Sequence, residues 1–365
     1  MSVGQTFPIA GVAIGMASVA AILVVVIAKL TRGRAAARSQ AMLAPYRSSL
    51  IAMVSGEDDE GQAHAALCAL PEPIWARLRP SVVAFLAKVR GIPADHLSHV
   101  MRAHGEIEEA TTMLTSRSAV RRAFAAYLLG LVRDPAAVTP LLPLLSDHDA
   151  DVRREAAWAL GAIGDPVAAG PVLDGLRRHH GQIGVPAWVV AEALLAMGVE
   201  IGPVLQLGLA SEDAAVRNVC ATVAGQGTYL SAAPQLRVLL ATDGDGDVRA
   251  SSAVTLGRVG GVGDTAILVR HTQACEPSAL RRICATALGD LGQPESLGAL
   301  AALLGDDDRR LAELAADSLV RLGPKGIAQL ESPAAGPEGL SARAAVGALE
   351  LAGLRGQLSV GADAA

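Results

Sequence analysis

The chain has 365 residues, a formal net charge of −5 and an apolar fraction of 51%, but only 2% of its residues are aromatic. Its apolar residues are mostly Ala, Leu and Val; Ala and Leu favour helices, whereas β-sandwiches and barrels use aromatic and β-branched residues. Composition therefore predicts an all-α protein. The weak negative charge argues against nucleic acid as a partner, and four widely spaced cysteines argue against a disulfide framework.

The first predicted element is a transmembrane helix over residues 8–29, after a short N-terminus of residues 1–7. The uncharged run PIAGVAIGMASVAAILVVVIA would rise about 31 Å as a helix, which matches the hydrocarbon core of a bilayer. Basic residues follow the run from Lys29 onward and none precedes it, so we expect the N-terminus outside the plasma membrane and the rest in the cytoplasm. A cleaved signal is the alternative, although signals usually begin with positive residues.

Within this helix, Gly11 and Gly15 form a G-x-x-x-G pair. Such spacing lets two membrane helices approach closely, which makes these glycines a candidate dimer face. The more ordinary interpretation is that Gly is simply common in membrane helices.

Residues 30–117 are predicted to form a basic juxtamembrane stretch and amphipathic leading helices. Two stretches, PIWARLRPSVVAFLAKV and HLSHVMRAHGEIEEATTML, have helical patterning but no repeated consensus. We expect them to cap the array that follows as degenerate repeats.

Residues 118–356 contain an internal repeat, followed by a flexible tail at 357–365. The template is residues 152–164, VRREAAWALGAIG, and each block alternates with a Leu-rich helical stretch. Acidic residues before the blocks suit helix caps, and glycines after them suit left-handed turns, so each unit reads as two antiparallel helices. Related blocks start at Val120, Pro186, Val216, Val248, Leu280, Leu311 and Ser341, and the closing glycines include Gly164, Gly260, Gly292 and Gly323.

The repeated string D-x-x-V-R-x-x-A-A-x-A-L-G-x-x-G resembles the short HEAT repeats of phycobilin lyases and of many bacterial scaffolds. The resemblance covers roughly Ser118–Arg355 and implies an α-solenoid in which the block helices line the concave surface. It also implies a likeness to bacterial membrane-anchored HEAT proteins, which can accompany membrane glycosyltransferases of polysaccharide synthesis.

Arginines recur at the second position of the blocks. They could bind anions, but acidic residues recur at matching intervals, so we expect structural Arg–acid pairs at the turns. The arginines are Arg121, Arg153, Arg217, Arg249 and Arg281.

Two patterns that resemble metal sites are interpreted as structural. The stretch TDGDGDVR mimics the start of a calcium loop, but Val248 and Val254 stand where that loop needs Gly and Glu. His96 and His99, with His104 and Glu106 nearby, are expected to face solvent, since metal binding needs at least three convergent groups. No cofactor or metal is expected.

The cysteines are likewise predicted to be structural. Cys220 and Cys284 occupy the fifth block position, where other blocks have Ala or Ser, so they should be buried packing elements. Cys68 and Cys275 lie apart from them.

The third, fourth and seventh block positions are predicted to lie off the core and to form a partner-binding surface. Trp and Arg are enriched at binding hot spots, and two of the three tryptophans fall on this surface. The alternative is that the tryptophans pack against neighbouring helices. The candidate residues are Arg154, Trp158, Trp188, Glu192, Asn218 and Arg282.

The sequence thus predicts a non-enzymatic, membrane-anchored scaffold that binds protein partners at the cytoplasmic face of the membrane. A polysaccharide-producing glycosyltransferase is one candidate client, and a homodimer through the membrane helix is a further expectation. The alternative is a ligand-binding or lyase-type protein resembling the bilin lyases, which the lack of an acid–base cluster weakens.

Overall fold

The computed structural model describes residues 43–58, 61–177 and 183–362, and these residues form helices and turns without any strand. The all-α prediction is therefore confirmed for the described chain. The chain divides into two compact units between Glu109 and Ala110, inside α5 (Glu106–Met113).

The first unit consists of short helices around a buried apolar core. Residues 43–55 form a helix that is followed by α2 (Gln62–Cys68), α3 (Glu72–Leu86) and α4 (Ile92–Ala103). The stretch predicted as helical over residues 96–114 is two helices, α4 and α5, because the chain turns at Gly105 with a φ of 71°.

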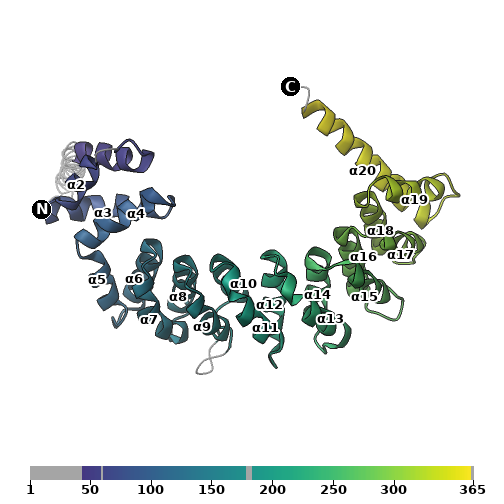
Figure 1. Ribbon diagram of the computed structural model, residues 1–365, viewed down its shortest axis with the longest axis horizontal. Helices are drawn as coiled ribbons and strands as arrows, with labels where there is room; N and C mark the ends of the chain where they lie inside the picture. Colours follow the sequence, from purple (N-terminus) through teal and green to yellow (C-terminus); the bar gives the residue numbers. More distant parts are fainter. Residues whose placement is uncertain (1–42, 59–60, 178–182, 363–365) are drawn as a thin grey trace, which may run out of the picture. The chain divides into compact units, whose positions relative to one another are not determined.

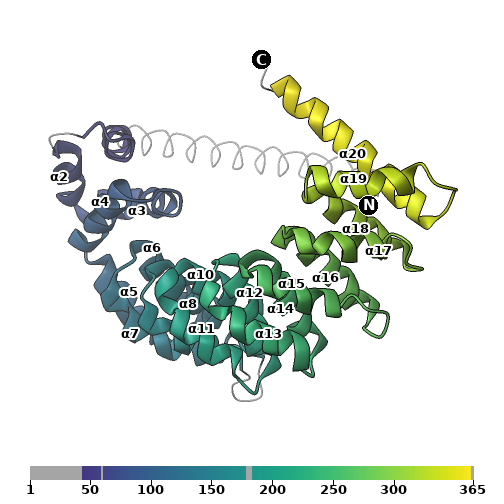
Figure 2. The same cartoon turned by 45° about the vertical axis from the view of Figure 1, so that its right-hand side comes forward.

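The second unit has two layers of helices, and Figures 1 and 2 show consecutive block helices lying side by side. Each block helix contacts the next, and each connecting helix also contacts the block helix that follows it. The α-solenoid prediction is confirmed. The block helices are α6 (Ala119–Val132), α8 (Ala150–Ile163), α10 (Ala187–Ala196), α12 (Ala214–Gln226), α14 (Gly246–Val259), α16 (Ser278–Leu291), α18 (Arg309–Arg321) and α20 (Leu340–Ala362). The connecting helices are α7 (Val138–Leu141), α9 (Ala169–Asp174), α11 (Gly202–Leu209), α13 (Ala233–Thr242), α15 (Thr265–Arg270), α17 (Leu297–Leu303) and α19 (Pro324–Ala334).

The first, fifth and ninth block positions form the core, as predicted. In α8 these are Val152, Ala156 and Leu160, all 0% exposed. Two blocks depart from this pattern at single positions, because Pro186 is exposed and Ser341 and Leu349 of the last block are only half-buried. In the first block Val120 is 78% exposed. The first block therefore begins one residue later than predicted, and Arg121 takes its first position.

Three of the five predicted arginines pair with turn acids in the described part of the chain, namely Arg217, Arg249 and Arg281. Arg217 binds Asp243 at 2.7 Å, and the side chains are 15% and 4% exposed. In the first block Arg122, not Arg121, makes the equivalent pair with Asp147, as the shifted register requires. Arg153 departs from the pattern, because its guanidinium donates to backbone carbonyls such as that of Ile183. The remaining pairs are Arg249–Glu276 and Arg281–Asp306.

The two aspartates of the turn before α14 have separate roles. In the stretch that resembles a calcium loop, Asp243 accepts from Arg217, while Asp245 caps α14 by accepting from the Asp247 and Val248 amides. Asp245 is therefore a typical N-cap, because its side chain accepts from backbone amides of the first turn that have no partner within the helix. The structural interpretation of this turn is confirmed.

The closing glycines only partly follow the prediction. Gly164 and Gly292 adopt the left-handed conformation, with φ of 80° and 70°. Gly323 also has a positive φ of 73°. Gly260 has a φ of −71° and extended backbone, so the turn after α14 needs no left-handed residue.

Candidate functional site

The predicted partner-binding residues lie on block helices of the second unit. Helix α8 contacts α10, and α10 contacts α12, so the first residues of the set lie on adjacent helices (Figure 1). Arg282 lies further along the array, beyond α14. By helix the residues are Arg154 and Trp158 on α8, Trp188 and Glu192 on α10, Asn218 on α12 and Arg282 on α16.

Trp158 is half-buried and packs against the preceding block helix. Its ring stacks with that of Tyr127 on α6, with centroids 5.3 Å apart and planes inclined by 28°. It also covers Gly130, where an added Cβ would lie 2.8 Å from Trp158 Cζ3. The alternative interpretation, packing against a neighbouring helix, therefore describes part of the Trp158 environment.

Trp188, in contrast, is 65% exposed near the start of α10. Glu192 follows one turn later on the same helix and is also exposed. The neighbouring Val189, which the positional pattern also placed on this surface, is buried with 3% exposure. The third and seventh positions of α10 thus face solvent, and the fourth does not.

Arg154 carries the positive charge at this surface. Its guanidinium lies 2.7 Å from Asp151 and 3.2 Å from Glu155, and the side chain is 41% exposed. Hydrogen bonds to Glu155 and then Asp151 raise the pKa of Arg154 above its usual range. The charge is therefore balanced locally and remains accessible to solvent.

The last two residues of the set are tied to the repeat framework. The Asn218 side chain is half-buried, and its backbone carbonyl accepts from Thr222 Oγ1 at 2.9 Å. Arg282 forms a two-point ion pair with Asp308, at 2.8 and 2.9 Å, which links α16 to the turn before α18.

Sequence reasoning missed two aromatic residues on this surface, Phe124 and Tyr127. With the corrected register they take the fourth and seventh positions of the first block, and Phe124 is 46% exposed. Aligning the two block sequences so that Gly130 matches Gly161 would have identified Phe124 and Tyr127 as surface residues. We call Phe124, Tyr127, Trp158 and Trp188 the aromatic face.

The aromatic face is unusual in this chain. Among the Phe, Tyr and Trp residues that the structure describes, only Phe124 and Trp188 are exposed, and both belong to it. The chain has nine such residues in total, three of each kind. Four of the nine lie on the three consecutive block helices α6, α8 and α10.

The cysteine prediction is confirmed for the repeats. Cys220 and Cys284 are 0% exposed, and burial raises the pKa of both thiols to about 12. They are therefore protonated packing residues rather than nucleophiles.

The histidines of the first unit are not uniformly solvent-facing. His104 stacks on Trp75 with ring centroids 4.0 Å apart, and Glu106 accepts from the Trp75 indole at 2.7 Å. His96 is half-buried beside His64, while His99 is exposed. The predicted group of four thus divides into a packed pair and a pair near α2.

A family model described as HEAT repeats matches residues 107–184, and one described as PBS lyase HEAT-like repeat matches residues 280–306. The chain therefore contains HEAT repeats in these two segments. The first match includes α6 and α8, so three residues of the aromatic face lie inside recognised HEAT repeats. Among curated proteins, none matches the chain.

Several solved structures match the chain but share little sequence with it. YibA of Escherichia coli is 16% identical, with a TM-score of 0.39, over 73% of this chain and 97% of that one. Human deoxyhypusine hydroxylase is 20% identical, with a TM-score of 0.29, over 80% and 96%. The CpcE–CpcF complex of phycocyanin lyase from Nostoc is 20% identical, with a TM-score of 0.27, over 66% and 93%.

The predicted membrane helix, with Gly11 and Gly15, lies outside the described residues. Within the described ranges, no single helix combines the length and apolar character needed to cross a bilayer. One pair of helical segments, Ala187–Ala196 with Val199–Leu209, meets those requirements only when joined, and it is bent by 115°.

Proposed function

We propose that this HEAT-repeat protein is a non-enzymatic scaffold that binds a protein or peptide partner on the aromatic face. The observation that carries the proposal is Trp188, which is 65% exposed on the helix next to the stacked Trp158 and Tyr127. Burying a large apolar side chain is worth about 2–3 kcal/mol, so a partner that covers this indole gains affinity directly.

The surroundings of Trp188 suit a protein partner. Trp and Arg dominate interface hot spots, and here Arg154 and Glu192 place opposite charges beside the aromatic rings. The stacking of Trp158 on Tyr127 restricts these rings before binding, which lowers the entropy cost of association. A groove for a small ligand would instead need an enclosed apolar cavity.

The second part of the proposal is attachment to the plasma membrane through residues 8–29. The sequence supports it by the length of the uncharged run and by the basic residues that follow. A membrane glycosyltransferase of polysaccharide synthesis is one client class, and pairing through Gly11 and Gly15 is the proposed route to a dimer. Deleting residues 1–29 should release the chain from sedimented membranes; retention would contradict the anchor.

Affinity capture from gently solubilised membranes tests the binding face. We expect Trp188→Ala to weaken partner binding by about 30-fold, the equivalent of about 2 kcal/mol for a hot-spot residue. Because Trp188 is largely exposed, the substitution should leave helicity by circular dichroism unchanged.

The matched control is Leu207→Ala, which removes a 77% exposed apolar side chain from connecting helix α11. It should bind the partner as the native chain does. Equal recovery with both variants would show that the aromatic face is not the binding surface. If no partner is recovered and a tetrapyrrole changes its visible absorption on mixing, the lyase-type alternative gains support.

A further inference from the structure

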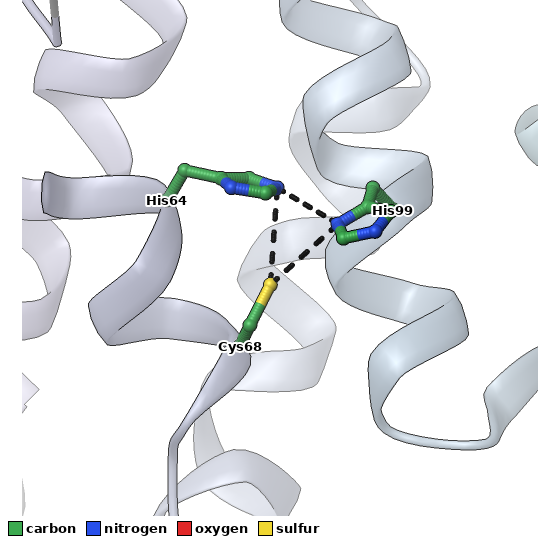
Figure 3. Close-up of side chains that lie close together, drawn as sticks. All are labelled: His64, Cys68 and His99. Atoms are coloured by element: carbon green, nitrogen blue, oxygen red, sulfur yellow. Dashed lines mark hydrogen bonds between the residues drawn. The ribbon is translucent and has the colours of Figure 1, made fainter. Parts of the chain in front are cut away.

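Three side chains with soft or borderline ligand atoms converge in the first unit. His64 and Cys68 are four residues apart on α2, so they lie on one side of that helix, and His99 comes from α4 (Figure 3). The distances are 3.8 Å from Cys68 Sγ to His64 Nε2, 3.8 Å from Sγ to His99 Nδ1, and 3.0 Å between the two nitrogens.

These separations are close to the edges of a zinc coordination tetrahedron. With Zn–N and Zn–S bonds of about 2.05 and 2.3 Å, tetrahedral angles put two nitrogens about 3.3 Å apart, and a nitrogen and a sulfur about 3.6 Å apart. The three distances here differ from those values by a few tenths of an ångström. A cation could therefore reach all three atoms with small side-chain rotations.

The backbone holds two of the ligands in place. The Asp58 carboxylate accepts from the Ala63 and His64 amides, both at 2.9 Å, and so fixes the first turn of α2, which carries His64. Helix α2 contacts α4, and Leu67 and Leu97, one from each helix, are 0% exposed. Ligands on two packed helices are better positioned than ligands on loops.

Burial has opposite effects on two of the ligands: it favours the metal-binding form of His64 and disfavours that of Cys68. Burial, followed by the nearby His99 and His96 rings, lowers the pKa of His64, which favours the neutral imidazole that binds metal. Burial raises the pKa of the Cys68 thiol, so metal binding would displace its proton to solvent.

We propose that His64, Cys68 and His99 form a binding site for a borderline-soft divalent cation, zinc, that joins α2 to α4. One thiolate and two imidazoles make a three-residue ligand set that leaves a fourth position for water. The site is separate from the aromatic face, and it does not depend on the proposed scaffold function.

The sequence signal for this site is H-x-x-x-C followed about 30 residues later by H-x-x-H. The first half has the i, i+4 spacing that zinc ligands use on one helix, but the two halves lie on different helices. Only the packing of α2 on α4 brings Cys68 to His99.

Cobalt titration of the full chain under reducing conditions tests the proposal. Co²⁺ takes the same ligands as zinc, and thiolate ligation gives an absorption band in the near ultraviolet. We expect one equivalent of Co²⁺ to saturate this band, and Zn²⁺ to remove it. Cys68→Ser should abolish the band, and His99→Gln should weaken Co²⁺ binding by at least about tenfold.

The control is Cys275→Ser, which removes an exposed thiol elsewhere and should leave the band intact. Trp188→Ala should also retain it, which separates this test from that of partner binding. Because His99 is exposed, His99→Gln should fold even if Cys68→Ser does not. Absence of the band in the native chain, its survival in Cys68→Ser, or unchanged affinity in His99→Gln would overturn the proposal.

Discussion

At the scale of single residues, paired arginines and aspartates hold the turns of the array. Arg217 spans from one block to the Asp243 turn before the next, and both side chains are largely buried. The matching spacing of Arg and Asp made these pairs predictable. The first block offers two adjacent arginines, Arg121 and Arg122. The register that selects Arg122 follows only when Gly130 is aligned with Gly161.

Arg217→Ala is expected to lower the free energy of unfolding by about 2 kcal/mol, since it leaves the Asp243 carboxylate buried without its cation. Urea unfolding followed by circular dichroism measures the change. Arg309→Ala is the control, because its pair with Glu313 is exposed and should contribute less than about 1 kcal/mol.

The same pair predicts how acid acts on the array. Arg217 holds the pKa of Asp243 below its usual range, and Arg281 does the same for Asp306. Because the folded pKa is lowered, this stabilisation is present above the unfolded value of about 3.9 and is lost as the pH falls through the folded value. When the pH is lowered below about 4, the free energy of unfolding should therefore fall less for Arg217→Ala than for the native chain. Equal acid sensitivity would contradict this assignment.

At the scale of helices, close contacts between neighbouring blocks depend on a glycine at the tenth block position. Gly161 faces Ala193 of α10, and Gly257 faces Ala287 of α16. The recurring glycine is visible in the sequence, but its role is not, because the approach of two helices depends on their packing geometry. The one-residue error in the first block, which concealed Phe124 and Tyr127, would have been avoided by aligning Gly130 with these glycines.

Gly161→Ala should destabilise the array by about 1–3 kcal/mol, because the added Cβ would lie 2.5 Å from Ala193 Cα, a backbone atom. Gly298→Ala is the matched control: it lies in α17 with nothing within 4 Å of the new Cβ. That change should be neutral or stabilise by up to about 1 kcal/mol. Thermal unfolding measures both changes, and equal melting temperatures for Gly161→Ala and Gly298→Ala would contradict the proposed close packing at Gly161.

At the scale of the whole molecule, the sequence predicted the helical array well and the first unit poorly. The repeats can be recognised in the sequence because each unit must present the same apolar positions to its neighbours. Residues 43–109 lack that constraint, so the meeting of His64, Cys68 and His99 depends on packing that no periodicity encodes. The aromatic face lies between these cases: Trp158 and Trp188 were identified, but their environments differ.

The most direct test of the scaffold proposal is photo-crosslinking in native membranes. A photoreactive amino acid is introduced in place of Trp188 on the aromatic face or in place of Leu207 on α11, two sites of similar exposure, 65% and 77%. We predict a discrete protein adduct from position 188, weakened by Arg154→Glu, and none from position 207. Equal adducts from both positions, or an adduct from position 207 alone, would contradict the proposal that this HEAT-repeat protein binds its partner through the aromatic face.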